Sequence, residues 1–556
     1  MDYVDKYRNG TLYNAYKYFG AHISELGYLF RVYAPNAKRV SIIGSFNNYI
    51  PELMKKTDER GIFELDLDVN EFEDYLFIID TGTETYYKSD PFAFYSNKRP
   101  STHSVVFNIK NLNRSTPLGV ESEGPVVIYE LHMGSFNLAT DYESLSTEVV
   151  AHCLDFGFTH IELLPITEHP LDESWGYQTS GYFSPTSRYG TPHGLSYLIE
   201  HCHKSNLGVI LDFVPGHFVA DEHALGKFDG SNIYERDGIF EKSEWGTLNT
   251  DFSKGPSTSL MLSSANYFIE YFGIDALRID AVNNIVYDKQ GKEDKAGILF
   301  LKKLNELNTV TFAEDSSMFH GVTDKNKLGF DYKWSIGFMN TTIKYFSGDV
   351  IKRKDLINEF THLFEYAFSE KFLLEYSHDE VVHLKGSLFQ KMPGSSESKF
   401  GNLRLMLGFM FAFPGKKLLF MGAEFAQKTE WDIKGQIQWE LLEQNELFVN
   451  YVKELIDYYK SEKIFYATDL LANSLEVIPT SNELLISYKR SLYKSVTVIL
   501  NTSDEDLWYQ QDAKCLVVFS SDDSRFGGNG IINNKDKLNK RFVIPKNTII
   551  YVKEVE

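Results

Sequence analysis

The stretch KFLLEYSHDEVVH, Lys371–His383, joins an apolar run to a cluster of polar residues, and it suggests how the central part of the chain folds. The run KFLLEY predicts a buried strand. Zinc-protease helices carry H-E-x-x-H, with the histidines four residues apart on one face. Here His378 and His383 are five residues apart, which turns them away from each other on a helix. Polar side chains at the carboxyl end of a buried strand are typical of barrel enzymes, whose chemistry lies at that face.

Similar apolar runs recur between about Val126 and Lys460, separated by amphipathic helical patterns. The predicted strands are VVIYELHM, HIELLPI, GVILDFV, ALRIDAV, TVTFAED, GFDYKWS, FLLEYS and KLLFMGAEF. Near-continuous apolar strands that alternate with helices predict a parallel (β/α)8 TIM barrel.

The regions on both sides of this barrel show short alternating strands instead. Segments such as YLFRVYAP and DYLFIID predict a small β-sandwich, and segments from SLEVIPT to TIIYVK predict a second all-β domain. The chain is therefore predicted to be multidomain. The predicted parts are a leader segment at 1–20, a β-sandwich module at 21–110, a linker at 111–125, the barrel at 126–463 and a C-terminal β-sandwich at 464–556.

The composition indicates which binding partners and which cellular compartment are expected for this protein. The 556 residues exceed one ordinary core, and 56 basic against 77 acidic residues give a net charge of −21. This balance argues against nucleic acid and against an anionic membrane as partners. Three widely spaced cysteines, Cys153, Cys202 and Cys515, argue against a disulfide framework and fit a reducing compartment. The N-terminus MDYVDKYRNG has no apolar signal region, so we expect a cytoplasmic protein.

Charged residues fall at the carboxyl ends of the predicted strands, where barrel loops converge on one pocket. Arg278 and Asp280 are two residues apart and so share one strand face. Several acids in one pocket are costly unless they meet a cation, an arginine or a substrate rich in donors. The residues concerned are Asp212, His217, Arg278, Asp280, Glu314, His378 and Asp379.

Two carboxylates in different environments are the machinery of glycosyl transfer. Arg278 is expected to keep Asp280 ionised for attack on an anomeric carbon. Glu314 follows the apolar run TVTFA, which favours a raised pKa and a proton for the leaving oxygen. Asp379 is expected to favour the oxocarbenium-like charge, and the histidines to donate to sugar hydroxyls. From spacing alone, ordinary solvated loop acids remain the alternative.

Four segments, DFVPGH, ALRIDAV, FAEDS and SHDEVVH, resemble the four sequence regions of the α-amylase superfamily of glycoside hydrolases and transglycosylases. Longer segments, among them YELHMGSF, GFDYKWSIGFMN and LLFMGAEFAQKTEWD, resemble glycogen (1,4-α-glucan) branching enzymes. The resemblance covers about Phe19 to Asn445. The segment FGAHISELGYLFRVYAPNAKRVSIIGSFNNY is similar to that family's carbohydrate-binding sandwich, so the N-terminal module is expected to be of this type.

The resemblance implies that an α-1,4 linkage of a glucan is cleaved and the released chain is transferred to a 6-hydroxyl by a retaining double displacement. Asp280 matches the family nucleophile, Glu314 the general acid/base and Asp379 the transition-state stabiliser. The expected partners are α-glucans such as glycogen, amylose and maltooligosaccharides, with no metal or organic cofactor. The residues expected to bind substrate are Trp175, Tyr177, Asp212, His217, Arg278 and His378.

The sequence also departs from the family pattern. The segment from Asp280 to Asn305 is shorter than its family counterpart, which borders the cleft and normally carries a longer loop. In FNNY, Tyr49 stands where the family usually has tryptophan. Two other functions stay open: an α-1,4- or α-1,6-glucan hydrolase of the same superfamily, and a non-catalytic glucan-binding protein.

Overall fold

The computed structural model describes residues 2–138, 141–317 and 319–555. The chain forms two compact units, each assembled from segments that are distant in the sequence. Unit 1 consists of Met1–Gly119, Ala139–Val150 and Leu163–Phe330, and unit 2 consists of Val120–Leu138, Ala151–Glu162 and Asp331–Glu556.

Eight strands form a closed barrel, which confirms the predicted fold class. Each strand coincides with one of the apolar runs identified in the sequence, the last strand beginning one residue before its run, because side chains on both faces of a barrel strand are covered. In barrel order the strands are β11 (Val127–Leu131), β12 (His160–Leu163), β15 (Gly208–Phe213), β18 (Ala276–Ile279), β19 (Val310–Ala313), β20 (Tyr332–Trp334), β21 (Phe372–Tyr376) and β22 (Lys416–Phe420).

Within unit 1, β15 pairs with β18 and β18 with β19, all in parallel. The register places Asp212 opposite Arg278 and Arg278 opposite Phe312. Within unit 2, β21 pairs in parallel with β20 and β22, and β22 with β11. Every residue of β15 and β18 is buried, so the charged side chains on these strands need partners inside the protein.

Helices follow the barrel strands along the chain. The longer ones are α3 (Tyr142–Phe156), α4 (Pro192–Lys204), α5 (Gly255–Tyr267), α7 (Lys295–Leu304), α8 (Ile336–Phe346), α9 (Val350–Tyr366), α11 (Ser396–Ala412) and α13 (Glu446–Ser461). Their boundaries follow local chemistry: Asp294 caps α7 by accepting from the backbone N–H groups of Ala296 and Gly297. Residues 401–412 of α11 are all buried, as expected for a core helix that is apolar on every side.

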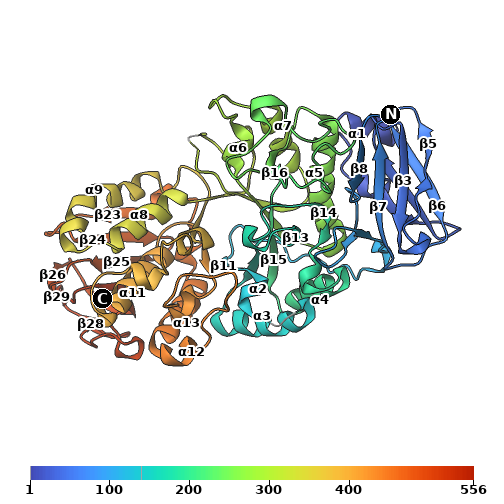
Figure 1. Ribbon diagram of the computed structural model, residues 1–556. Helices are drawn as coiled ribbons and strands as arrows, with labels where there is room; N and C mark the ends of the chain where they lie inside the picture. The colour runs from blue at the N-terminus through green and yellow to red at the C-terminus, as the bar shows by residue number, and fades with distance from the viewer. Residues whose placement is uncertain (1, 139–140, 318, 556) are drawn as a thin grey trace. The chain divides into compact units, whose positions relative to one another are not determined.

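The N-terminal module contains two antiparallel sheets, seen as the blue strands around β3, β6 and β7 in Figure 1. One sheet has the order β1-β2-β6-β5, and the other has β4-β3-β7-β10-β9 with β8 beside β7. Their bounds are β1 Gly20–Ile23, β2 Tyr28–Tyr33, β3 Arg39–Gly44, β4 Glu52–Leu53, β5 Lys55–Asp58, β6 Ile62–Leu67, β7 Asp74–Asp80, β8 Thr85–Lys88, β9 Tyr95–Ser96 and β10 Ser104–Val105.

Buried polar contacts join this module to the barrel segments of unit 1. The buried ammonium of Lys88 donates to the backbone carbonyls of Glu222, Ala224 and Gly226 at 2.5, 3.2 and 2.7 Å. The backbone N–H of Asn36 donates to the carboxylate of Asp229 at 2.7 Å. Because a buried ammonium without acceptors is costly, these carbonyls fix the module at this point.

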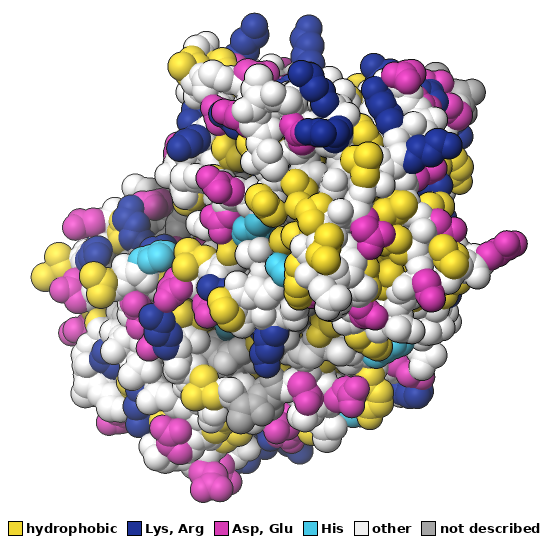
Figure 2. Space-filling model, turned by 45° about the vertical axis from the view of Figure 1, so that its right-hand side comes forward, with side chains coloured by type: hydrophobic (Ala, Val, Ile, Leu, Met, Phe, Trp, Pro, Cys, Tyr) yellow, Lys and Arg dark blue, Asp and Glu magenta, His cyan; other side chains and the backbone are white. Residues whose placement is uncertain are grey.

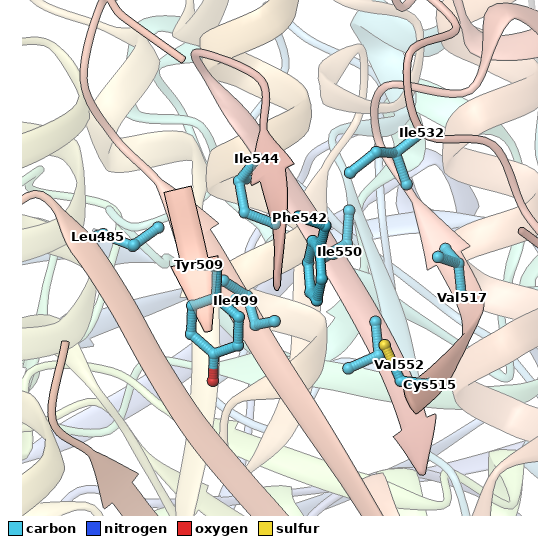
Figure 3. Close-up of a cluster of buried hydrophobic side chains, with 10 residues drawn as sticks. All are labelled: Leu485, Ile499, Tyr509, Cys515, Val517, Ile532, Phe542, Ile544, Ile550 and Val552. Carbon is cyan, nitrogen blue, oxygen red and sulfur yellow. The ribbon is translucent and has the colours of Figure 1, made fainter. Parts of the chain in front are cut away.

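The C-terminal region, in unit 2, contains a six-stranded sheet in the order β23-β24-β25-β30-β27-β28 and the pair β26-β29. The sequence patterns did not identify the short strands β26 and β28. Figure 3 shows the apolar cluster between these sheets, where Ile499, Val517, Ile544 and Ile550 are almost completely buried. The bounds are β23 Leu475–Ile478, β24 Leu485–Ser491, β25 Ser495–Asn501, β26 Leu507–Gln510, β27 Lys514–Ser520, β28 Lys537–Leu538, β29 Arg541–Ile544 and β30 Thr548–Val555.

The surface carries charges of both signs, and Figure 2 shows acidic and basic side chains interspersed over the face that it displays. Among the helices of residues 2–138, 141–317 and 319–555, none combines the length and the apolar character that crossing a membrane needs.

Candidate active site

Arg278 is the centre of a buried cluster of charges at the ends of three strands in unit 1. Its guanidinium Nη1 lies 2.7 and 2.8 Å from the two carboxylate oxygens of Asp212, and 2.8 Å from Oδ1 of Asp280. Its Nη2 lies 3.1 Å from Oε2 of Glu314. Since Arg278 is only 1% exposed, these interactions are poorly screened by water. One side chain therefore joins three of the carboxylates predicted from the sequence.

The carboxylate of Asp280 is held in its ionised form. Oδ2 lies 3.7 Å from Nε2 of His217. Burial by itself raises the pKa of Asp280, but the interaction with His217 and the charge of Arg278 outweigh burial and hold this pKa below its ordinary value. An ionised carboxylate next to a cation is the form that attacks as a nucleophile.

Glu314 is fixed by the backbone as well as by Arg278. Its Oε2 accepts a 2.8 Å hydrogen bond from the N–H of Ala281, the residue after Asp280. Ala281 has a φ of 46°, a left-handed conformation that is uncommon for residues other than glycine. This turn directs the Ala281 N–H toward the carboxylate at the end of β19.

Asp212 has a different electrostatic environment from Asp280. The hydroxyl of Tyr177 donates to its Oδ2 at 2.5 Å, and the Tyr177 ring lies 5.7 Å from the guanidinium carbon of Arg278. Burial raises the pKa of Asp212 to about 6, although Arg278 acts in the opposite direction. One guanidinium cannot neutralise three carboxylates, so the cluster favours retention of at least one proton when it is desolvated.

Tyr182, which the sequence patterns did not single out, donates to two backbone carbonyls of the loop that carries His217. The Tyr182 hydroxyl is 3.0 Å from the carbonyl oxygen of Val214 and 2.9 Å from that of His217. Trp175, predicted to bind substrate, lies two residues before Tyr177 and has a φ of 56°. Its half-buried side chain belongs to the same short loop as Tyr177.

His378 and Asp379 lie in unit 2, in the short 3-10 helix that follows β21 after Ser377. The ring Nδ1 of His378 is 2.5 Å from Oε1 of Glu130, and its backbone N–H donates to Oε2 of the same residue at 2.9 Å. Glu130 lies on β11 and is completely buried. These contacts fix the ring so that Nε2 faces Asp379, whose Oδ1 lies 3.4 Å away. The side chain of Asp379 is 46% exposed and so remains accessible.

Glu130 was not among the residues predicted from the sequence, although an acid inside the apolar strand VVIYELHM was a visible signal. The indole of Trp431 also lies near His378, with ring centroids 6.5 Å apart, and its N–H donates to the hydroxyl of Ser135 at 2.8 Å. Among residues 2–138, 141–317 and 319–555, no group of three or more histidine, cysteine, aspartate or glutamate side chains is arranged to hold a metal ion.

Comparison with known families assigns two parts of the chain. Residues 18–93 match carbohydrate-binding module 48 (isoamylase N-terminal domain), and residues 147–244 match the alpha amylase catalytic domain. The first match falls on the N-terminal module, and the second includes β12 and β15 of the barrel.

The chain is also similar to curated proteins over almost its whole length. It is 40% identical to the 1,4-alpha-glucan branching enzyme GlgB of Bacillus caldolyticus, with 95% of this chain and 86% of that protein covered. It is 38% identical to the protein of the same name from Bacillus subtilis (strain 168), with 95% and 92% covered.

Solved structures match the fold at low sequence identity. Pullulanase from Anoxybacillus sp. LM18-11, complexed with maltotetraose, has a TM-score of 0.79 at 17% identity and covers 97% of this chain and 87% of its own. Pullulanase type I of Bacillus subtilis str. 168, complexed with maltose, has a TM-score of 0.77 at 19% identity, with 97% and 85% covered. At these identities the likeness concerns the fold alone.

Proposed function

The chain belongs to the family of 1,4-alpha-glucan branching enzymes, and we propose that it forms α-1,6 branches in an α-1,4-glucan by transferring an oligosaccharide to a 6-hydroxyl. The substrates are α-glucans of the glycogen or amylose type and their maltooligosaccharides. The enzyme class is therefore glycosyltransferase, acting by transglycosylation.

One observation supports the assignment of catalytic residues most directly: Asp280 and Glu314 contact the same guanidinium, that of Arg278. A retaining double displacement needs two carboxyl groups about 5–5.5 Å apart, one as nucleophile and one as acid/base. Two carboxylates within about 3 Å of the two terminal nitrogens of one guanidinium are compatible with that separation.

In the proposed first step, the Asp280 carboxylate attacks the anomeric carbon of a glucosyl residue. The bond between that carbon and the linkage oxygen breaks, and Glu314 gives its proton to the departing oxygen. The products are a glycosyl ester on Asp280, a shortened chain with a new non-reducing end, and an ionised Glu314.

In the second step, ionised Glu314 takes the proton of a glucose 6-hydroxyl, and the resulting oxygen nucleophile attacks the same anomeric carbon. The ester bond breaks, Asp280 returns as a carboxylate and Glu314 is protonated again. Two inversions at one carbon retain the α configuration.

We assign the remaining predicted residues to substrate binding. The Tyr177 ring lies beside the Arg278 guanidinium, which suits stacking under the cleaved sugar. Asp379, with its accessible carboxylate, is proposed to stabilise the positive charge of the transition state. The residues proposed to contact hydroxyls or to line the subsite are Trp175, Asp212, His217, Arg278 and His378.

Two broader predictions also remain proposals. The domain boundaries, 21–110 for the module, 126–463 for the barrel and 464–556 for the C-terminal region, await dissection by truncation. A cytoplasmic location is supported by the thiols of Cys202 and Cys515, which are free and buried.

The test uses the purified protein with amylose and follows three signals: iodine colour, reducing ends and the chains released by a debranching enzyme. Branching lowers the iodine colour, produces almost no reducing ends and yields new short chains only after debranching. Reducing ends that rise in step with colour loss would show a hydrolase instead. No change in any signal would show that the protein is inactive on amylose, as expected of a non-catalytic glucan-binding protein, and either result would overturn the proposal.

A further inference from the structure

A completely buried carboxylate of unit 2 binds the residue that precedes Asp379. Glu130 lies on β11, and its two oxygens accept from the backbone N–H and from the ring Nδ1 of His378. In barrel order, β22 separates β11 from β21, the strand that ends shortly before His378. The contact therefore joins two strands that are not neighbours, and it fixes both the backbone and the ring of His378.

The contacts of Glu130 require a carboxylate rather than an amide. Both of its oxygens face N–H donors of His378, at 2.5 Å for the ring and 2.9 Å for the backbone. A glutamine side chain has one oxygen and one NH2 group, so it could accept only one of these two bonds. The other donor would then face the amide nitrogen and lose its partner inside the protein.

The ring of His378 lies between two carboxylates. Its Nδ1 faces Glu130, and its Nε2 lies 3.4 Å from Oδ1 of Asp379. Because an ionised carboxylate only accepts hydrogen bonds, a ring that meets one on each side is favoured in its doubly protonated form, with an N–H on both nitrogens. The rings of Phe420 and Trp431 lie 6.1 and 6.5 Å from this buried ring, so water screens the two interactions poorly.

The orientation of the Asp379 carboxylate depends on this ring. The side chain of Asp379 is 46% exposed, and an exposed carboxylate rotates freely unless a neighbour holds it. The main chain is held separately, since the Lys385 ammonium donates to the backbone carbonyl of Asp379 at 2.8 Å. A carboxylate that stabilises a developing positive charge has to be in place before the reaction. The Nε2–H of His378 supplies this restraint, and Glu130 fixes the position of His378.

We infer that Glu130 is a positioning residue of the transfer reaction: through His378, it holds the charge of Asp379 where positive charge develops in the transition state. The inference rests on the proposed function and adds a residue that is itself buried out of reach of the substrate. Because the charge of Asp379 is needed most in the transition state, Glu130 acts on the rate of the chemical step more than on the binding of the glucan.

The test compares Glu130→Gln with Glu424→Gln as the matched control. Glu424 is also completely buried in unit 2, and its Oε1 lies 2.8 Å from Nε2 of His152 and 2.9 Å from the hydroxyl of Tyr129. Both substitutions change one buried carboxylate into an amide, so both should lower the unfolding midpoint. With α-maltosyl fluoride as the donor, only Glu130→Gln should lower kcat, by about 10²-fold, and its KM should change by less than about twofold.

A double variant shows whether Glu130 acts through His378. His378→Asn keeps an amide N–H near the position of the ring Nδ1 but removes Nε2, so it should lower kcat by itself. Adding Glu130→Gln to His378→Asn should lower kcat by no more than about a further twofold, because the link to Asp379 is already lost. If the two losses multiply instead, Glu130 acts independently of His378 and the inference is wrong.

Two results for the single variants would also overturn the inference: a kcat of Glu130→Gln equal to that of the unaltered protein, or an equal loss of kcat in Glu424→Gln. If Glu130→Gln does not fold, Glu130→Asp takes its place, because it keeps the buried charge and withdraws the carboxylate from His378 by the length of a methylene group. The same selective loss of kcat is then expected. If the unaltered protein forms no branches on amylose, the proposed function itself fails.

Discussion

The backbone N–H of Ala281 lies 2.8 Å from the carboxylate oxygen Oε2 of Glu314 and donates a hydrogen bond to it. Because Ala281 directly follows Asp280, this bond couples the end of β18 to the acid at the end of β19. The relative position of the two acids thus depends on backbone geometry, which fluctuates less than a pair of flexible side chains. Preorganised sites of this kind keep reacting groups near their productive geometry.

The first prediction concerns the nucleophile. Asp280→Asn removes the charge that attacks the anomeric carbon but keeps the size of the side chain. We expect branching activity on amylose to fall by about 10³-fold or more, as for removal of a catalytic nucleophile. Circular dichroism and the unfolding midpoint should show a folded protein. Asp68→Asn, at an exposed position of the N-terminal module, is the matched control, and near-normal activity of Asp280→Asn would refute the assignment.

The second prediction separates the acid from the nucleophile. Glu314→Gln cannot protonate a leaving sugar oxygen, so branching of amylose should fall steeply. Fluoride needs no such proton, so the first step with α-maltosyl fluoride should retain far more of its rate than the reaction with amylose. The measurement is fluoride release in a single turnover. Equal losses on both donors would contradict a role as general acid.

The third prediction concerns Arg278 and stability. Removing one partner of a buried ion cluster leaves charges without compensation, which typically costs about 3–5 kcal/mol. We expect Arg278→Ala to lower the free energy of unfolding by about this amount, measured by chemical denaturation. Arg39→Ala breaks an ion pair with Asp80 in which the arginine side chain is 70% exposed, and it should cost less than about 1 kcal/mol. Equal costs for the two variants would show that the Arg278 cluster is not the buried network described above.

The barrel strands could be predicted because each is a short apolar run, and burial on both faces leaves that pattern in the sequence itself. The acids at the strand ends were found for the same reason, since Asp212, Asp280 and Glu314 each interrupt or end such a run. Glu130 was missed because its role depends on a contact with His378, 248 residues away. A local sequence pattern does not indicate which distant residue a side chain contacts in the fold.

The shape of the segment after His378 could not be predicted from local patterns either. A short 3-10 helix covers only His378–Val381. His383 and Leu384 then adopt left-handed conformations, with φ values of 58° and 66°. The carboxylate of Glu430 accepts from the backbone N–H of Leu384, so a residue distant in the sequence shapes this loop.

The fourth prediction is a pH effect at Asp90 in the N-terminal module. Its carboxyl accepts from the backbone N–H of Phe92 at 2.9 Å and from the hydroxyl of Tyr75 at 2.8 Å, and burial raises its pKa to about 7. The folded protein thus keeps a proton that the unfolded chain loses at its ordinary pKa of 3.8. The stabilisation that this retained proton gives to the folded state is complete below pH 3.8. It falls as the pH rises from 3.8 to about 7 and is lost above about pH 7.

The check compares unfolding midpoints of the unaltered protein and Asp90→Asn across this range. The variant has no proton to lose, so the difference between the two proteins should change steadily from pH 4 to about pH 7 and then become constant. The unfolding midpoint of Asp68→Asn, a variant at an exposed position, should change with pH in the same way as that of the unaltered protein. If the midpoint of Asp90→Asn also follows that of the unaltered protein, Asp90 is ionised in the folded module over this pH range.

The fifth prediction concerns the strained loop in unit 2. Leu384 has a φ of 66° and a side chain that is 98% exposed, so its side chain contributes little packing while its backbone conformation is unfavourable. Leu384→Gly and Leu384→Ala remove the same exposed side chain, but only glycine adopts a left-handed conformation without strain. We expect the glycine variant to be more stable than the alanine variant by about 1 kcal/mol in chemical denaturation. The same two substitutions at Leu299, which is 53% exposed within α7, should give the opposite order, because glycine is unfavourable inside a helix. The same order at both positions would mean that the loop is not held in the left-handed conformation by Glu430.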